Sequence, residues 1–212
     1  MTVAENILQA IKQTSILEWL GVLSSIAYVI LAAFRKILCW PFGFLSSAIY
    51  VYICYTSNLY LETGLQIFYV GMAVYGWMNW MKQNQKNVPV IHWKLMLHLG
   101  LILGGIMITV GLGYYFKANT KQASPYLDAA ITVFSFMATW MTAKRVVEGW
   151  IYWIIVDFAA IFLYASRDLY LSALLYFIFT VMSVSAFFQW YNQIKVQQKK
   201  LPIDHQILDT NL

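Results

Sequence analysis

The apolar residues of this 212-residue chain fall in blocks long enough to cross a lipid bilayer. A helix needs about 20 predominantly apolar residues to cross the hydrocarbon core. Charged residues make up only 11% of the chain, whereas soluble domains carry about 25%. The blocks are near-continuous, and a membrane β-barrel would instead alternate between apolar and polar residues. The sequence therefore predicts an all-α integral membrane protein.

Charged and turn-forming residues divide the apolar sequence into seven predicted transmembrane helices. Their expected ranges are Ile16–Phe34, Trp40–Thr56, Leu61–Met81, Leu95–Phe116, Tyr126–Thr142, Trp150–Tyr164 and Leu169–Trp190. Residues 1–15 are expected to form an amphipathic lead-in, and residues 194–212 a polar cytoplasmic tail.

Basic residues are divided unequally between the two sets of loops. The loops on the side of the N-terminus hold four of them: Lys12, Lys117, Lys121 and Arg167. The opposite loops and the tail hold the other ten of the 14 lysines and arginines. Cytoplasmic loops carry the excess of basic residues, so the N-terminus is expected outside and the C-terminus in the cytoplasm of a bacterial inner membrane. The net charge of +5 is thus an orientation signal and does not indicate nucleic-acid binding.

Parts of the sequence recur, without a gap, at an offset of 110 residues. The matches are Arg35 with Arg145, Trp40 with Trp150, Trp80 with Trp190, and Leu59-Tyr60-Leu61 with Leu169-Tyr170-Leu171. The repeat covers residues 16–81 and 126–193, and a linker helix region, residues 82–125, lies between the copies. Three crossings invert the chain and a fourth restores its direction, so the two triplets must run parallel. This 3+1+3 plan is SWEET-like and predicts a substrate site between the triplets, near the membrane midplane.

One face of the predicted sixth helix carries two indoles and a carboxylate. Trp150, Trp153 and Asp157 are separated by three and four residues, which places them on the same side. A charge near the middle of a span costs about 2.5–3.5 kcal/mol, so Asp157 must face a cavity, a partner or a ligand. It aligns with Ser47 in the first copy, and a purely structural acid would more naturally occur in both. We interpret the three residues as a substrate site; packed tryptophans and an acid bonded to a neighbouring helix are the alternative.

Polar residues on other helices extend this candidate site. Ser47 and Tyr50 lie on the second helix, Gln66 and Tyr69 share a face of the third, and Tyr176 is the repeat counterpart of Gln66. Polar groups within a span need partners, which either a polyhydroxylated ligand or an adjacent helix would supply.

Other residues are predicted to have structural roles. In the fourth helix we expect close packing through Gly100, Gly104, Gly105, Gly111 and Gly113. Interfacial anchoring is expected of Trp19, Trp77, Trp80, Trp93 and Trp190. Arg145 and Glu148 are expected to form an ion pair within one loop.

The sequence contains no phosphate-cradling glycine loop, no Walker lysine and no His or Cys set with metal-ligand spacing. It therefore predicts no cofactor, no metal site, no catalytic residues and no ATP-driven pump, and we expect a protein that is not an enzyme. With Asp157 as the single intramembrane acid, facilitated diffusion is a simpler hypothesis than ion coupling. A ligand-binding membrane sensor or scaffold is the alternative from another functional class.

Several motifs, in order along the chain, resemble the bacterial PnuC family of vitamin transporters. They are Trp40-Pro41-Phe42-Gly43, Leu65-Gln66 with Tyr69, Gly76-Trp77-x-x-Trp80, Trp150-x-x-Trp153-x-x-x-Asp157 and Leu169-Tyr170. The resemblance runs from about Glu18 to Trp190. It implies the 3+1+3 fold, an external N-terminus and uptake of nicotinamide riboside, which a separate cytoplasmic kinase then traps by phosphorylation. Relatives carry thiamine or riboflavin, and thiamine stays open as the alternative substrate.

The residues agree with this expectation. Nicotinamide riboside joins a flat cationic ring to a polyhydroxyl ribose, and a cation over an indole face gains about 0.5–2 kcal/mol. Trp150 and Trp153 could stack on the ring, and Asp157 could balance its charge. Gln66 and Ser47 offer hydrogen bonds from the other triplet. The expected partners are thus the riboside and the lipid bilayer, with no nucleic acid; a homo-oligomer is compatible with the sequence.

Overall fold

The structure, a computed structural model, describes residues 3–56, 60–82, 89–119, 124–167 and 169–209. They form eight helices: α1 (Val3–Gln13), α2 (Ile16–Ala33), α3 (Cys39–Thr56), α4 (Tyr60–Lys82), α5 (Leu95–Asn119), α6 (Pro125–Ala143), α7 (Gly149–Ala165) and α8 (Tyr170–Asp209). Helices α2 to α8 fall on the seven predicted segments with small shifts at their ends. The exception is α8, which continues well beyond Trp190. Leu59 of the repeat match and Lys121 of the charge count lie outside the described residues.

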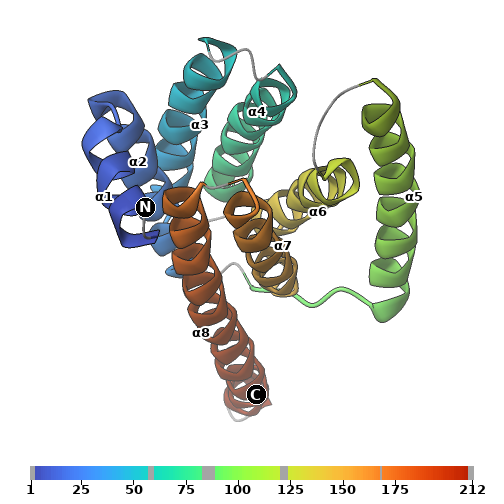
Figure 1. Ribbon diagram of the computed structural model, residues 1–212. Coiled ribbons are helices and arrows are strands. Elements are labelled where there is room, and N and C mark those ends of the chain that lie inside the picture. Colours follow the sequence, from blue (N-terminus) through green and yellow to red (C-terminus); the bar gives the residue numbers. More distant parts are fainter. Residues whose placement is uncertain (1–2, 57–59, 83–88, 120–123, 168, 210–212) are drawn as a thin grey trace.

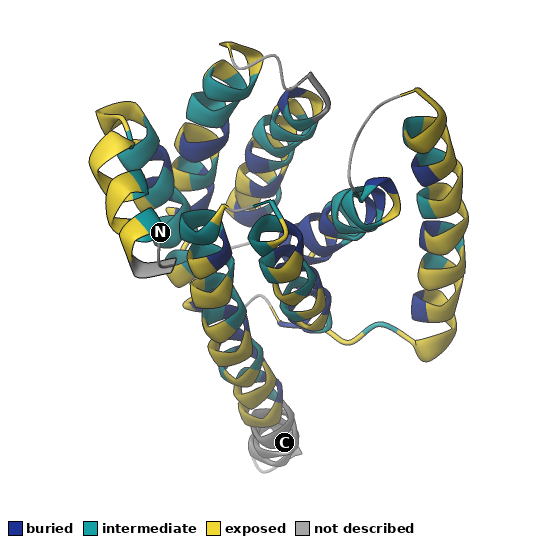
Figure 2. Cartoon of the chain, in the orientation of Figure 1, coloured by how far each residue is buried: buried dark blue, intermediate teal, exposed yellow. Residues whose placement is uncertain are grey.

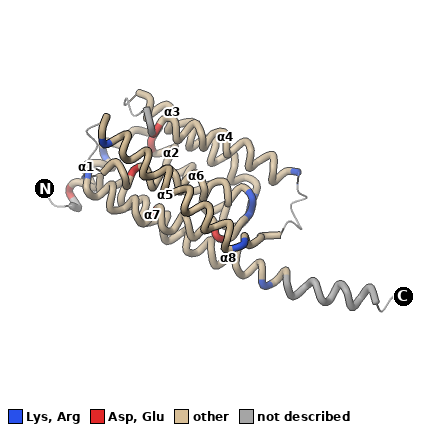
Figure 3. The backbone as a smooth tube through the Cα atoms, turned by 90° about the vertical axis from the view of Figure 1, so that its right-hand side faces the viewer, with Lys and Arg blue, Asp and Glu red and all other residues tan. Residues whose placement is uncertain are grey.

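Three helices of the described chain are long and apolar enough to cross a membrane by length and hydropathy alone. They are α2, α5 and the part of α8 from Tyr170 to Gln197, and α7 is a shorter apolar helix. Helices α3, α4 and α6 carry hydroxyl, amide and carboxylate side chains along their length, which lowers their hydropathy. The structure is therefore that of an all-α membrane protein, and charged residues gather toward the two ends of its bundle (Figure 3).

The helices form two groups of three (Figure 1). Consecutive helices pack together within α2–α4 and within α6–α8, and the groups meet where α2 packs on α8 and α4 on α6. Both meetings thus join the first helix of one triplet to the third of the other. Helix α5 stands at the edge and packs on α6.

Two of the five glycines predicted to pack in α5 do so. A Cβ on Gly105 would lie 2.9 Å from Phe134 Cζ, and one on Gly113 would overlap the ring of Tyr126. The prediction was wrong for Gly100, Gly104 and Gly111, which have nothing within 4 Å of such a Cβ. Buried residues accordingly follow the inner faces of the bundle, whereas much of α5 is exposed (Figure 2).

Helices α2 and α6 end in the same turn, 110 residues apart. Lys36 N donates to Leu31 O at 2.8 Å, and Val146 N donates to Met141 O at 2.9 Å. These are the long hydrogen bonds of a Schellman motif, whose preceding residue adopts a positive φ and is usually glycine. Here those residues are Arg35, with φ 56°, and Arg145, with φ 60°. A left-handed conformation costs a non-glycine residue about 1–2 kcal/mol, and both turns carry this cost at an arginine.

Four tryptophans form a layer across the bundle, which we call the tryptophan layer. It consists of Trp40, Trp80, Trp150 and Trp190, each at most 2% exposed. Their rings meet in sequence, with centroids 5.4 Å apart for Trp40 and Trp80, 6.4 Å for Trp80 and Trp190, and 5.5 Å for Trp190 and Trp150. The predicted anchoring at the membrane interface was therefore wrong for Trp80 and Trp190, which belong to the core.

Hydrogen bonds from the tryptophan layer cross between the triplets in both directions. Trp80 Nε1 donates to Ala143 O, and Trp190 Nε1 donates to Ala33 O, both at 3.1 Å. Ala33 and Ala143 are themselves 110 residues apart. The last carbonyls of a helix lack donors within it, and a buried indole N–H needs an acceptor. Each triplet thus supplies an indole donor to a helix-end carbonyl of the other.

Residues 89–94, which we call the strap, connect the turn after α6 with α5. Ile91 N donates to Arg145 O, and Val147 N donates to Ile91 O, both at 3.1 Å. Glu148 accepts from Trp93 N at 3.4 Å and pairs with His92 Nδ1 at 2.7 Å. The predicted ion pair between Arg145 and Glu148 was wrong, because the strap occupies the glutamate.

Close packing of Trp40 on α4 yields a first prediction. A Cβ on Gly76 would overlap the Trp40 indole, whereas one on Gly71, a turn and a half away, meets nothing within 4 Å. Overpacking of a core costs about 1–3 kcal/mol. We expect Gly76→Ala to lower the thermal unfolding temperature of the purified protein by several degrees, and Gly71→Ala to leave it unchanged or slightly higher. Equal unfolding temperatures for the two variants would contradict this packing.

Candidate functional site

A cavity of about 650 Å³ lies between the two triplets. Helices α2, α3, α4, α6, α7 and α8 line it, together with the turn between α7 and α8. Every residue predicted for the substrate site lies on its wall: Ser47, Tyr50, Gln66, Tyr69, Trp150, Trp153, Asp157 and Tyr176. The structure thus brings these residues together, and their binding of a substrate stays a prediction.

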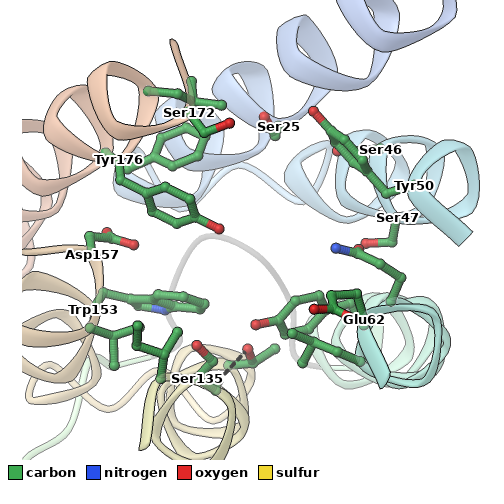
Figure 4. A pocket seen from close by; sticks show the side chains of 18 of the residues that line it. Ser25, Ser46, Ser47, Tyr50, Glu62, Ser135, Trp153, Asp157, Ser172 and Tyr176 are labelled. Atoms are coloured by element: carbon green, nitrogen blue, oxygen red, sulfur yellow. Dashed lines mark hydrogen bonds between the residues drawn. The ribbon is translucent and has the colours of Figure 1, made fainter. Parts of the chain in front are cut away.

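Asp157 lies on the α7 wall and is 3% exposed. Its Oδ2 accepts a hydrogen bond from Ser183 Oγ on α8 at 3.2 Å, and its side chain also borders the cavity. Figure 4 shows it on the same wall as Trp153 and Tyr176. Each carboxylate oxygen can accept more than one hydrogen bond, so the contact with Ser183 leaves capacity for a ligand.

The two tryptophans of the α7 motif differ in position. Trp153 extends across the cavity (Figure 4), and its Nε1 donates to Thr142 Oγ1 at 3.3 Å. Trp150 borders the cavity but is 2% exposed and meets Trp190 nearly edge-on, with an interplanar angle of 84°. Trp153 therefore offers an indole face to a ligand, and Trp150 chiefly forms part of the wall.

The opposite wall comes from the first triplet. Figure 4 shows Ser47, Tyr50 and Glu62 across the cavity from Asp157. Ser46, next to Ser47, donates to Gly21 O at 3.0 Å and so fastens α3 to α2. Within the described part of the chain Ser47 has no such acceptor, which leaves its hydroxyl for the cavity.

The two ends of the cavity differ in chemistry. We call the end with residues 34–38, 89–94 and 144–148 the tail end, because α8 projects from it, and the opposite end the head end. Toward the tail end the wall consists of Trp40 and Trp150, backed by the rest of the tryptophan layer. We expect these closely packed indoles to restrict the access of water at this end.

Charged residues border the head end. Arg167, after α7, donates to Asp128 of α6, and Glu62 of α4 lies on the cavity wall. The ring of Tyr164 stacks on Tyr176 with centroids 5.0 Å apart. Sequence reasoning missed Glu62, Asp128, Arg167 and Tyr164 as site residues. Acids in the first turn of a helix are common for electrostatic reasons, so nothing in their spacing indicated a cavity.

The lining has an excess of negative charge. Its described residues include three carboxylates, on Glu62, Asp128 and Asp157, and a single basic side chain, Arg167, which is paired with Asp128. The described residues contain no group of three or more His, Cys, Asp or Glu able to hold a metal ion. The site is suited to a cation that also carries hydroxyl or amide groups.

Comparisons with known proteins agree on one family. Residues 15–192 match the family model described as nicotinamide mononucleotide transporter. The chain is 23% identical over 206 residues to the nicotinamide riboside transporter PnuC of Escherichia coli, covering 84% of this chain and 86% of that protein. It is 24% identical over 162 residues to the riboflavin/roseoflavin transporter RibM of Streptomyces davaonensis, covering 74% and 76%.

A solved structure has the same fold. The crystal structure of the vitamin B3 transporter PnuC matches with a TM-score of 0.71 at 23% identity, covering 91% of this chain and 88% of that one. This similarity supports the helical architecture described above.

Closure of the tail end yields a second prediction. In a variant whose native cysteines are replaced, a cysteine at Gln66 should react with a charged thiol reagent added at the head end, and much more slowly when it is added at the tail end. A cysteine at the neighbouring Ile67, which is 57% exposed on the outer face of α4, should react from neither side, because the reactive thiolate needs water. The initial rates of the thiol reaction in intact cells and in inverted vesicles measure access from the two sides of the membrane. Equal rates from the two sides would contradict the seal.

Proposed function

Because the chain belongs to the nicotinamide mononucleotide transporter family, we propose that it carries nicotinamide riboside across a bacterial inner membrane by facilitated diffusion. The observation that carries this proposal is the negatively charged, aromatic cavity between the two triplets. Its chemistry favours the riboside over the mononucleotide in the family's description. The riboside ring is cationic, whereas a 5′-phosphate would bring a negative charge into a space with three carboxylates and one paired arginine.

The arrangement of the walls supports one mode of binding. The pyridinium ring stacks on the indole of Trp153, and the Asp157 carboxylate balances its charge. The ribose and carboxamide extend toward Ser47, Tyr50 and Gln66, where hydroxyl and amide groups border the cavity. Tyr69 and Tyr176 close the sides. Because the cavity draws on both triplets, a bound ligand contacts each of them.

We also propose that α2 to α8 all cross the membrane, in the 3+1+3 arrangement with parallel triplets. The matched turns at Arg35 and Arg145, the reciprocal bonds of Trp80 and Trp190, and the pairing of α2 with α8 and α4 with α6 support it. Polar residues on α3, α4 and α6 face the cavity, which explains their lower hydropathy. The excess of basic residues at the tail end supports a cytoplasmic C-terminus.

In this proposal the substrate moves by alternating access. One triplet rocks against the other, so that the cavity opens first at the head end and then at the tail end. When the two triplets move apart at the tail end, the indole hydrogen bonds of Trp80 and Trp190 break. Phosphorylation by a separate cytoplasmic kinase then traps the riboside, since the product does not suit the acidic cavity.

Ligand selectivity provides the third prediction. Purified protein should bind nicotinamide riboside and should not bind its 5′-phosphate at the same concentrations, as measured by isothermal titration calorimetry. Thiamine, also a cationic aromatic, serves as competitor, and riboflavin, which is uncharged at the ring, as a further test. Tighter binding of the phosphate than of the riboside would refute the proposal, and displacement by lower concentrations of thiamine would reassign the substrate.

The fourth prediction concerns two side chains on the α7 wall. Trp153→Ala should weaken riboside binding about 2- to 30-fold, because the cation loses its indole face. Asp157→Asn should weaken it about tenfold, since a charged partner is replaced by a neutral one of the same shape. Phe158→Ala, which removes a ring 54% exposed on the other side of α7, is the matched control. Unchanged affinity in both site variants would exclude this binding mode.

Flux separates a transporter from a membrane sensor or scaffold. Labelled riboside should enter empty liposomes that contain the protein and stop at equal concentrations on both sides. Binding without entry would identify a sensor, and accumulation against a gradient would show coupling to an ion.

A further inference from the structure

We propose that Arg35 and Arg145 form an anion site at the tail end, which takes a phosphate group and clamps the two triplets together. The two arginines are repeat counterparts and come one from each triplet. They lie outside the cavity described above, beyond the tryptophan layer. The existence of the site does not depend on the proposed function, although its effect on transport does.

Arg145 is a buried arginine whose Nε lacks an acceptor among the described residues. It is 4% exposed, and its Nε has no hydrogen-bond partner within the described part of the chain. The guanidinium carbon lies 4.5 Å above the ring of Trp80. No described acidic residue forms an ion pair with it, because Glu148 pairs with His92. A buried charged group with an unsatisfied donor is costly, which points to a ligand that completes the site.

The backbone fixes Arg145 in this position. Its φ of 60° sets the direction of the side chain, and its carbonyl accepts from Ile91 N of the strap. A structural role for the guanidinium would be to bond the last carbonyls of the neighbouring helix ends. Two of those carbonyls already have side-chain donors: Ala143 O accepts from Asn79 and Trp80, and Ala33 O accepts from Trp190.

Arg35 brings a second positive charge to the same place. Burial and the nearby Arg35 charge lower the pKa of Arg145 to about 10, and burial also lowers the pKa of Arg35. Arg35 follows Ala33 by two residues, and Arg145 follows Ala143 by two. The indoles that bond these two carbonyls, Trp190 and Trp80, have centroids 6.4 Å apart. The two positive charges therefore lie on the same boundary between the triplets and repel each other. An anion between them would offset this repulsion and accept a hydrogen bond from Arg145 Nε.

Phosphate is the ligand chemistry that this pair fits. A guanidinium donates two parallel hydrogen bonds to phosphate oxygens, and phosphate has enough oxygens to serve two such groups. The group could come from a soluble phosphomonoester, from inorganic phosphate or from the headgroup of an anionic lipid, and the chemistry of the site is the same.

Under the proposed function, such a ligand inhibits transport. Opening of the tail end separates α2 from α6 and α8, and hence Arg35 from Arg145, so an anion held by both arginines favours the closed state. A phosphorylated compound in the cytoplasm would thus slow further uptake. Inhibition should require phosphate at the tail end only.

Equilibrium dialysis of labelled inorganic phosphate against the full-length protein in detergent tests the site directly. We expect saturable binding that becomes about tenfold weaker in Arg145→Gln and in Arg35→Gln, the loss typical of a removed charge-assisted hydrogen bond. Lys36→Gln removes one positive charge next to Arg35 and is the control, with binding nearly unchanged. If Arg145→Gln does not fold, Arg145→Lys and the half-buried Arg35 variant still provide the test.

A second arm identifies the source of the phosphate group. Where inorganic phosphate binds in detergent, glycerol phosphate is the competitor that tests for a phosphomonoester. If inorganic phosphate does not bind in detergent, the unfolding temperature of the protein is compared between nanodiscs of phosphatidylcholine and nanodiscs that contain phosphatidylglycerol. A rise with phosphatidylglycerol that both arginine variants abolish assigns the site to a lipid headgroup. No binding in either arm, or equal effects in all variants including Lys36→Gln, overturns the proposal.

Discussion

The reciprocal hydrogen bonds between indoles and helix-end carbonyls determine how the two triplets meet. Trp80 reaches Ala143 in the second triplet, and Trp190 reaches Ala33 in the first. The end of a helix has carbonyls that lack donors within the helix, and for Ala33 and Ala143 an indole of the opposite triplet supplies the donor. These two contacts lie at the tail end of the cavity, and Arg35 and Arg145 follow the two accepting residues by two positions each.

In the proposed 3+1+3 arrangement the scaffold is symmetric, whereas the cavity is asymmetric. Where the second copy has Trp153, the first has Gly43, and the ring of Tyr28 packs where a Cβ on that glycine would be, 2.9 Å away. Where the second copy has Asp157, the first has Ser47. At these matched positions one wall therefore offers an indole and a carboxylate, and the other a glycine and a hydroxyl group. A ligand with a flat cation at one end and a polyol at the other matches this division, which a symmetric ligand would not exploit.

The helical segments and the eight cavity residues could be predicted from the sequence, because both depend on local properties. Long apolar runs define the helices, and a polar residue such as Gln66 or Asp157 inside a run needs a partner wherever the chain lies. The roles of Trp80 and Trp190 could not be predicted in this way. A tryptophan near a helix end suits a membrane interface and a core equally well, and the choice depends on which helices meet. Likewise, Glu148 pairs with a strap that the sequence alone does not bring near it.

The polar lining of α3, α4 and α6 also has a consequence for biogenesis. A translocon releases a segment into lipid according to its own hydropathy, and these segments are the least apolar of the bundle. Strongly apolar neighbours flank them: α2 precedes α3, and α5 precedes α6. We therefore expect the chain to enter the membrane as helical pairs. In each pair a strongly apolar helix holds a less apolar one near the bilayer until the helices of the second triplet cover its polar face. The polar side chains that line the cavity would thus make the membrane insertion of these helices cooperative.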